Sequence, residues 1–417
     1  MRLPVDGLFH QLMKAPVMRS VNGIALLDLI RKSGPISRAG LSKLSRLSKP
    51  TVSEQVNWLI RQGVVIELGQ GKVGRTGGKR PTLVDFNVDA GRVVGVNIGA
   101  SRTTVASADL RGRIVASQTF DTAPEEGAGP VLQRIYRAIT GLKRKDALVA
   151  DKLRVIAVGV PGRVDCDRGV VLESSNIFGW RKVDVRSYFQ DKLGVDVLVD
   201  NDANVALLGE LNHGDAREAS NAVLIKLDTG IGSAMAIERR IYHGSHWASG
   251  EIGHVAPDPQ AALEHPDPRG HLESVVGADQ IAKRVGIAAR RSRTIRSLLK
   301  ANTPIAALFL AAADADPEAV PIARELESRL KVVVAQQALA FDPDVVVLSG
   351  EIFTHTLEAI RSFLSKTIPW PVTISLSRLG DDAILLGAIV MALEAVYEQM
   401  SRQLQPEAAA QPVRVGA

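Results

Sequence analysis

The 417-residue sequence contains a single cysteine, Cys166. One thiol cannot form an intrachain disulfide, so the fold depends on its core, and nothing in the cysteine usage indicates an oxidising compartment. The sequence also lacks an uninterrupted apolar run of the roughly 18–20 residues that cross a bilayer. Its first residues lack the apolar stretch and the small-residue cleavage site of a secretory signal. We therefore expect a cytoplasmic protein without a membrane-spanning segment.

Aromatic residues are scarce as well, at 4% of the chain, whereas apolar residues make up 46% and charged residues 23%. The apolar and charged fractions are ordinary for a soluble globular protein. A chain of this length buries sizeable cores and divides into two or three domains.

The net charge of +6 conceals an asymmetry along the chain. Residues 1–86 carry 14 Lys and Arg against 5 Asp and Glu, whereas the remaining 331 residues carry 37 against 40. A basic segment attached to a nearly neutral body is typical of nucleic-acid-binding proteins, although an ordinary solvated basic face gives the same count.

The basic segment has the helix signals of a DNA-binding motif. Apolar residues recur at helical spacing across 19–32. Ser37 is an N-cap candidate for a short second helix, and Ser48 followed by Pro50 begins a third helix that Gly63 ends. Two short helices joined by a tight turn, the second capped and amphipathic, predict a helix-turn-helix, with a plain helical hairpin as the alternative.

Two strand-like segments, 64–68 and 81–86, flank a loop with five glycines and four cationic side chains. This arrangement predicts the wing of a winged helix, whose cations follow a phosphate path or enter the minor groove. The loop lacks P-loop spacing, so we do not assign nucleotide binding to it. The candidate DNA-contacting residues of the third helix and the loop are Ser48, Lys49, Thr51, Ser53, Glu54, Asn57, Arg75, Lys79 and Arg80.

The rest of the chain alternates strands with helices. Three short strands are predicted at 93–98, 103–108 and 114–119, and a second unit begins at 222–227 and returns through 234–237. The two units resemble each other, which indicates a distant internal duplication. Further β-branched runs suit strands that are covered on both faces. We predict an α/β body in two lobes.

Two polar motifs of the body are candidates for a ligand site. DNDAN at 200–204 follows an apolar strand, and GEIGH at 250–254 places a carboxylate between glycines ahead of an imidazole. Carboxylates, amides and an imidazole suit a polyhydroxylated ligand, because each hydroxyl both donates and accepts a hydrogen bond. The alternative is that these residues only cap helices and turns.

These motifs, together with GHLE at 270–273, resemble the signature of the ROK family of repressors, open reading frames and sugar kinases. The resemblance covers about residues 93–399, and the basic segment ahead of it resembles the DNA-binding extension of the repressor branch. It implies an N-terminal winged helix-turn-helix followed by a two-lobed, actin-like ATPase (ribonuclease H-like) body, with the ligand between the lobes. The sugar contacts that it implies are Asn201, Asp202, Glu251, His254, Glu273 and Asn176.

The resemblance also divides the chain. We expect the DNA-binding domain at 18–86 and the ligand-sensing body at 90–400. The Gln-, Pro- and Ala-rich tail at 401–417 has no apolar period, so we expect it to be disordered.

The two loops that bind phosphates in the family's kinases are altered. The kinase pattern D-x-G-G-T-K is replaced by NIGASR, so Asn97 loses the metal-organising charge and Ala100 adds a Cβ where the backbone approaches phosphate. In the second loop, Asp228 replaces a glycine and would repel phosphates. We therefore expect no bound ATP-Mg²⁺ and no catalytic residue, although Asp202 would be the base of a kinase. Alternatively, Asn97 and Asp228 merely occupy turns.

The family's zinc site is altered too. Its three cysteine positions hold Glu264, Pro266 and His271, and proline offers no side-chain ligand. A site of His254, Glu264 and His271 falls short of the four ligands of a closed structural zinc site. We therefore expect neither zinc nor another cofactor.

Together these expectations describe a sugar-responsive transcriptional regulator, a repressor of carbohydrate-utilisation genes. It would bind a double-stranded operator as a homodimer or a dimer of dimers, with a small sugar or sugar derivative as the effector. Two alternatives stay open: an ATP-dependent sugar kinase that retains a DNA-binding head, and a DNA-binding protein whose body responds to a protein partner.

Overall fold

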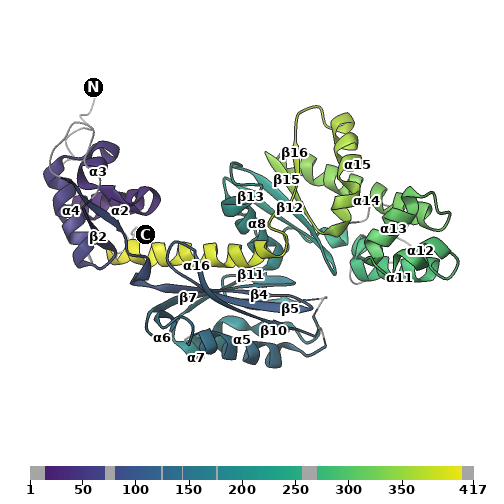
Figure 1. The fold of residues 1–417 in the computed structure, drawn as a ribbon, viewed down its shortest axis with the longest axis horizontal. Coiled ribbons are helices and arrows are strands. Elements are labelled where there is room, and N and C mark those ends of the chain that lie inside the picture. The colour runs from purple at the N-terminus through teal and green to yellow at the C-terminus, as the bar shows by residue number, and fades with distance from the viewer. Residues whose placement is uncertain are drawn as a thin grey trace, which may run out of the picture.

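The computed structural model describes residues 15–70, 80–123, 125–142, 144–174, 177–255 and 270–405. Figure 1 shows an N-terminal unit, coloured purple, followed by two lobes that are each built on a β-sheet. The long helix α16 (Asp382–Gln403), coloured yellow, runs from the second lobe across the first to the N-terminal unit. The end of the described chain therefore lies beside its beginning.

The N-terminal unit packs three helices on a three-stranded sheet. The helices are α2 (Ala15–Ser33), α3 (Arg38–Ser45) and α4 (Lys49–Arg61). The antiparallel sheet has the order β1-β3-β2, made of β1 (Ile36–Ser37), β3 (Thr82–Phe86) and β2 (Val65–Gln70). The predicted helices and the predicted strand pair are present, and the loop 71–79 lies outside the described residues.

Both predicted N-caps of this unit are present. The Ser37 hydroxyl accepts a hydrogen bond from the Gly40 amide at 3.0 Å, and the Ser48 hydroxyl accepts one from the Thr51 amide at 3.3 Å. These bonds satisfy first-turn amides that have no partner within their helix. The sequence therefore determines where α3 and α4 begin.

The first lobe contains a five-stranded sheet with the order β11-β7-β4-β5-β6. Its strands are β4 (Arg92–Ile98), β5 (Arg102–Ala108), β6 (Ile114–Asp121), β7 (Leu153–Val160) and β11 (Asp196–Asn201). Strands β4, β5 and β6 form an antiparallel meander, and β7 and β11 continue the sheet parallel to β4. One face is covered by α5 (Ala128–Leu142), α6 (Leu148–Lys152) and α7 (Val185–Leu193). A small sheet adjoins β11 and contains β8 (Arg163–Asp165), β9 (Val170–Glu173) and β10 (Arg181–Asp184).

The second lobe repeats this plan. Its sheet has the order β14-β13-β12-β15-β16, again with three antiparallel strands followed by two parallel ones. The strands are β12 (Ala222–Leu227), β13 (Ile231–Ile237), β14 (Arg240–Ile241), β15 (Val345–Ser349) and β16 (Thr373–Leu376). The outer helices are α10 (Glu273–Val276), α11 (Ala278–Ala288), α12 (Arg293–Leu298), α13 (Pro304–Ala313), α14 (Ala319–Phe341) and α15 (Glu351–Thr367). The shared strand order confirms the predicted duplication.

Two helices fill the space between the lobes. Helix α8 (Asp202–His213) packs on the second sheet, α16 packs on the first, and the two helices pack against each other. Strand residues alternate between the two faces, so Val93 joins the core around α16 whereas Val94 faces α5 and α7. The core around α8 and α16 is continuous with the core of the N-terminal unit.

Helix α16 extends beyond the boundary expected from the sequence. A disordered tail was expected from residue 401, but α16 continues to Gln403. Val396, Met400 and Leu404 recur every four residues and are buried in the core that includes the N-terminal unit, which explains the longer helix. Residues 406–417, the rest of the expected tail, lie outside the described residues.

Within the described residues, α16 is also the helix that is long and apolar enough by composition to cross a membrane. However, 61% of its apolar window is buried inside the protein. Its apolar side chains pack against β4, β7 and α8, so the core of this fold accounts for its composition.

Candidate functional site

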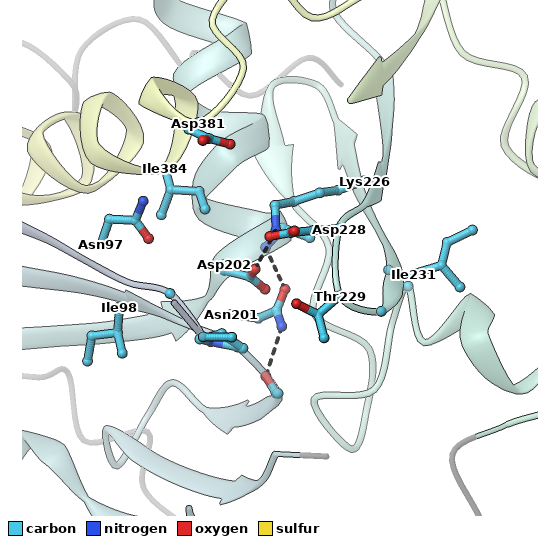
Figure 2. A pocket seen from close by; sticks show the side chains of 18 of the residues that line it. Asn97, Ile98, Asn201, Asp202, Lys226, Asp228, Thr229, Ile231, Asp381 and Ile384 are labelled. Carbon is cyan, nitrogen blue, oxygen red and sulfur yellow. Dashed lines mark hydrogen bonds and ion pairs between the residues drawn. The ribbon is translucent and has the colours of Figure 1, made fainter. Parts of the chain in front are cut away.

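A cleft opens between the two lobes, at the N-terminal ends of α8 and α16 (Figure 2). It holds about 1340 Å³ of empty space, counted to its open mouth. Ligand pockets occur preferentially at such interfaces between domains. The charged and amide side chains that line it are Asn97, Arg102, Asn201, Asp202, Lys226, Asp228, Glu251, Glu273, Asp381 and Asp382.

The DNDAN motif spans the junction of β11 and α8. The Asn201 side chain caps the helix, because its Oδ1 accepts hydrogen bonds from the amides of Ala203 at 2.9 Å and Asn204 at 3.3 Å. Its Nδ2 donates to the Gly162 carbonyl at 2.8 Å. The capping alternative therefore holds for Asn201, whereas Asp202 presents its carboxylate to the cleft in the first turn of α8.

Lys226 of β12 forms ion pairs with two carboxylates of the cleft. Its Nζ lies 3.0 Å from Asp202 Oδ2 and 3.6 Å from Asp228 Oδ2, as Figure 2 shows. Burial disfavours the charged lysine, but the carboxylates of Asp202 and Asp228 outweigh this effect and raise the pKa of Lys226 to about 12. Asp202 is thus engaged by a permanent cation from the opposite lobe.

Glu251 brings a second carboxylate toward Asp202. Removal from bulk water between the lobes raises the pKa of Glu251, and the Asp202 charge adds to this effect, while His254 and Arg163 partly offset it. The Glu251 side chain is nevertheless open to the cleft itself. It can therefore accept a hydrogen bond from a ligand that replaces water in the cleft.

Glu273 connects two loops at the cleft wall. Its Oε2 accepts a hydrogen bond from the Ile231 amide at 3.1 Å, which fixes the turn between β12 and β13. Gly253 lies against the same carboxylate, since a Cβ built there would be 3.3 Å from Glu273 Oε2. Glu273 lines the cleft and also supports the loops around it.

Two predicted sugar contacts are not brought into the cleft by the described structure. His254 ends the short helix η2 (Ile252–His254), is exposed, and does not line the cleft. Its predicted role required the ring to point inward, but here only its backbone neighbours Glu251 and Gly250 contribute to the cleft wall. Asn176 lies outside the described residues.

The altered loops lie side by side in the cleft. The Asn97 Oδ1 atom is buried and has no hydrogen-bond partner among the described residues. Asp228 is 71% exposed, and its backbone amide bonds to the Gly230 carbonyl at 2.9 Å. The Gly99 amide donates to the Arg102 carbonyl at 3.0 Å, which closes the other turn. The two loops therefore present the Asn97 amide, the Asp228 carboxylate and the Arg102 guanidinium to the cleft.

Of the residues around the expected zinc position, the structure describes His254 and His271. His271 Nε2 is buried without a hydrogen-bond partner, and His254 is exposed. Glu264, the third candidate ligand, lies outside the described residues. Among the described residues, three potential metal ligands come together at another place, next to Asn201 of the cleft. They are Cys166, Asp200 and His243.

The candidate DNA-contacting residues gather on one side of the N-terminal unit. Ser48, Lys49, Glu54 and Asn57 are exposed on α4, while Thr51 and Ser53 are half-buried. Arg38 at the start of α3 holds this surface in place, because its guanidinium donates to Asn57 Oδ1 at 2.8 Å and to Glu67 Oε1 at 2.7 Å. Of the predicted loop residues, Arg80 is exposed, and Arg75 and Lys79 lie outside the described residues.

The sequence interpretation missed Lys226, Arg102, Asp381 and Asp382 as cleft residues. Lys226 had a usable signal, since it is the one charged residue in the apolar strand AVLIKL at 222–227. Asp381 and Asp382 had none, because only the packing of α16 on the first sheet brings its first turn to the cleft.

The body has two five-stranded sheets of the same plan, with α8 and α16 packed between them and a cleft between the lobes. This architecture is the actin-like ATPase fold. Solved structures agree with this assignment. The crystal structure of a ROK family transcriptional regulator, a homologue of the Escherichia coli MLC protein, matches with a TM-score of 0.74 and 24% identity, over 93% of this chain and 98% of that one.

The chain belongs to the ROK family, whose sequence profile matches residues 93–395. The xylose repressor of Caldicellulosiruptor bescii is 26% identical over 90% of this chain and 96% of that protein. The glucokinase of Thermotoga maritima is 28% identical over 73% of this chain and 98% of that protein. The repressor alignment thus extends beyond the body into the N-terminal unit.

Proposed function

We propose that the chain is a sugar-responsive transcriptional regulator, a repressor of carbohydrate-utilisation genes. The observation that carries this proposal is the course of α16. Its first turn lines the cleft with Asp382 and Leu385, and its last turns pack against the N-terminal unit. A helix of 22 residues is about 33 Å long. Helix α16 therefore connects the cleft rigidly to the basic unit, so a conformational change at the cleft can be transmitted along it.

The contact at the far end of α16 is specific. The Tyr397 ring meets Phe86 of β3 edge-on at 6.1 Å between centroids, and the Arg31 guanidinium of α2 lies 4.2 Å from the Tyr397 centroid. Nearby, Arg111 of the first lobe donates to both carboxylate oxygens of Asp85 at 2.5 and 3.2 Å. These contacts fix how the N-terminal unit sits on the body.

The N-terminal unit acts in this proposal as a winged helix-turn-helix. Helices α3 and α4 are joined by a three-residue turn, and α4 begins with Lys49, whose ammonium group can reach phosphate where a recognition helix enters the groove. The strand pair β2–β3 flanks the basic loop that would be the wing. Net positive charge in residues 1–86 supplies the phosphate attraction that such binding requires.

The cleft is the proposed sugar receptor. Asp202, Glu251 and Glu273 offer acceptors for hydroxyl groups, and the unpartnered Asn97 Oδ1 offers another. The Lys226–Asp202 ion pair withholds the carboxylate that would remove a proton from a sugar hydroxyl. The proposed protein therefore binds sugar without phosphorylating it, and it needs neither ATP-Mg²⁺ nor the zinc of the family's cysteine site.

Operator binding would use a homodimer or a dimer of dimers, because two copies related by a two-fold axis match a palindromic site. The sugar must bind the two conformations with different affinities, which typically couples the sites by about 1–3 kcal/mol. The proposal places this regulator in the cytoplasm, where the operator lies.

Selection of bound duplexes from a random pool by the full chain tests this proposal. The selected duplex should bind about 10³-fold or more tightly than random duplex. A panel of pentoses, hexoses and amino sugars should contain one compound that raises the melting temperature and changes the affinity for the selected duplex by about 5- to 150-fold. A chain that prefers no duplex refutes the regulator, and one that responds to no sugar favours the alternative of a protein partner.

A sugar kinase that retains a DNA-binding head is the second candidate. Thr229-Gly230-Ile231-Gly232 is kept from the kinase loop, Asp202 occupies the position of the base, and the glucokinase relative aligns over its full length. An assay of ADP release with ATP-Mg²⁺ and glucose or xylose distinguishes the two. Turnover that Asp202→Asn abolishes would establish the kinase, and no turnover in the parent chain supports the regulator.

A further inference from the structure

Three potential metal ligands meet behind the cleft, and they come from both lobes. Cys166 follows β8, and Asp200 lies in β11 of the first lobe, whereas His243 lies in the loop after β14 of the second lobe. The donor atoms of the three side chains all lie within 4.8 Å of one another. Asp200 immediately precedes the Asn201–Asp202 pair of the cleft, so the cluster lies next to the sugar site without belonging to it.

The Asp200 carboxylate is the centre of this cluster and is only 4% exposed. Its Oδ2 pairs with His243 Nε2 at 2.8 Å, and its Oδ1 accepts hydrogen bonds from the Cys166 thiol at 3.2 Å and from Asn204 Nδ2 at 2.9 Å. The Trp247 ring meets the His243 ring edge-on at 5.5 Å between centroids and limits its rotation. The ligand set is therefore held in place before any ion arrives.

We propose that Cys166, Asp200 and His243 bind a divalent transition-metal ion of the Zn²⁺ class that joins the two lobes. Sulfur, imidazole nitrogen and carboxylate oxygen are the donors that Zn²⁺ takes, at about 2.3, 2.0–2.1 and 2.0–2.2 Å. Donor atoms around such an ion lie roughly 3–4 Å apart, so only small side-chain movements convert the hydrogen-bonded cluster into a three-ligand site. Solvent completes the tetrahedron.

Proton balance distinguishes this site from a simple hydrogen-bond network. The Cys166 thiol donates a hydrogen bond to Asp200 Oδ1, so it carries its proton in the metal-free cluster. The ion binds the thiolate and a neutral imidazole, so it displaces the Sγ proton to solvent. Binding therefore releases at least one proton and becomes tighter as the pH rises.

The location gives the ion a structural consequence. The loop that carries His243 touches the first lobe again through the His246 carbonyl, which accepts a hydrogen bond from Arg163 at 3.4 Å. An ion bound by Asp200 and His243 replaces their hydrogen bond with two metal–ligand bonds and leaves the contact between Arg163 and His246 in place. The bound ion therefore adds a link between the two lobes and restrains their separation.

Titration of the metal-free full chain with Co²⁺ tests this site, because the chain has one cysteine. A thiolate-to-cobalt charge-transfer band in the near ultraviolet can arise only from Cys166. A site built from the histidines near position 254 would bind Co²⁺ without that band. We expect a band that saturates at one equivalent and is displaced by Zn²⁺. Co²⁺ binding without the band, or no binding, overturns the proposal.

Variants then assign the remaining ligands. His243→Gln should weaken Zn²⁺ affinity by at least about 10-fold. Removal of a side chain that only supports a ligand already costs about 10- to 100-fold, and a direct ligand should cost no less. His246→Gln, an exposed histidine on the same loop, is the matched control and should leave the affinity unchanged. Equal affinities of these two variants would refute His243 as a ligand. If His243→Gln fails to fold, the cobalt band and the proton release of the unaltered chain still decide the question.

Discussion

Gly209 of α8 and Gly387 of α16 face each other where the two central helices cross. A Cβ built on Gly387 would lie 1.7 Å from the Val205 carbonyl oxygen and 2.9 Å from the Gly209 amide nitrogen. A Cβ on Gly209 would in turn lie 2.2 Å from the Ala383 carbonyl oxygen. The backbones touch here, so no side chain separates the two helices where they cross.

Gly387→Ala should therefore destabilise the protein. The new methyl group cannot fit unless the helices move apart, and overpacking of this kind costs about 1–3 kcal/mol. Denaturant unfolding measures the change. Gly286→Ala is the control, because Gly286 lies in a helix with nothing near its Cβ position and should gain up to about 1 kcal/mol from helix propensity. Equal effects at both positions would contradict the close crossing.

Asp202→Asn should weaken binding of the effector sugar by about 10- to 150-fold, the loss expected for a charged hydrogen bond worth about 1.5–3 kcal/mol. Calorimetric titration with the panel sugar that raises the melting temperature most provides the measurement. Asp228→Asn is the comparison, because that carboxylate is 71% exposed and lies toward the former phosphate side. A larger loss from Asp228→Asn than from Asp202→Asn would place the sugar differently.

Tyr397→Leu should separate sugar binding from its effect on DNA. Leucine keeps apolar volume but removes the ring over Arg31 and the hydrogen bond that Tyr397 donates to the Leu110 carbonyl. Sugar affinity should stay the same, while the sugar-dependent change in operator affinity shrinks by several-fold. Tyr188→Leu removes a similar ring–cation contact, with Lys192, far from the N-terminal unit and should leave the coupling intact. Unchanged coupling in both variants would exclude α16 as the path.

Lys49→Ala should weaken binding to all duplexes alike and reduce the salt slope of log affinity by about 1, because one phosphate contact is lost. Fluorescence anisotropy at several salt concentrations measures both quantities. Lys300→Ala removes an exposed lysine of the second lobe and should change neither. A loss confined to the selected duplex would instead make Lys49 a base contact.

The Asp200–His243 pair should make stability depend on pH when a chelator removes metal ions. Its hydrogen bond raises the pKa of His243 above the ordinary value of 6.5, so the protonated ring stabilises the folded state. This contribution is complete below the unfolded pKa and disappears as the pH rises through the folded pKa. Unfolding of His243→Gln should therefore show a larger deficit at about pH 5.5 than at about pH 9. A deficit of the same size at both pH values would contradict this contribution of the pair.

Local signals in the sequence predicted much of the fold. Ser37 and Ser48 cap the helices that they were expected to cap, and the strand runs of both lobes lie where β-branched residues cluster. These features depend on neighbours in the chain. Asn201 shows the limit of a family resemblance, because its side chain caps α8, as the motif alone favoured, whereas the resemblance implied a sugar contact.

Features that depend on packing between distant segments could not be predicted. Lys226 reaches Asp202 only because two strands from different sheets face one cleft, and His243 meets Asp200 only because the lobes close behind it. His254 was expected to point inward, but no local pattern determines which way η2 turns its side chain. The continuation of α16 past residue 400 likewise required the buried partners of Met400 and Leu404.

The course of α16 also bears on how the protein is made. The apolar core of the basic unit includes Leu26 and Phe86 from the first quarter of the chain, and the same core contains Val396 and Leu404, which follow both lobes in the sequence. A ribosome releases Val396 and Leu404 only after the basic unit and both lobes have emerged. The core of the basic unit is therefore completed only after the body has been synthesised, so a nascent chain that still lacks α16 lacks part of this core.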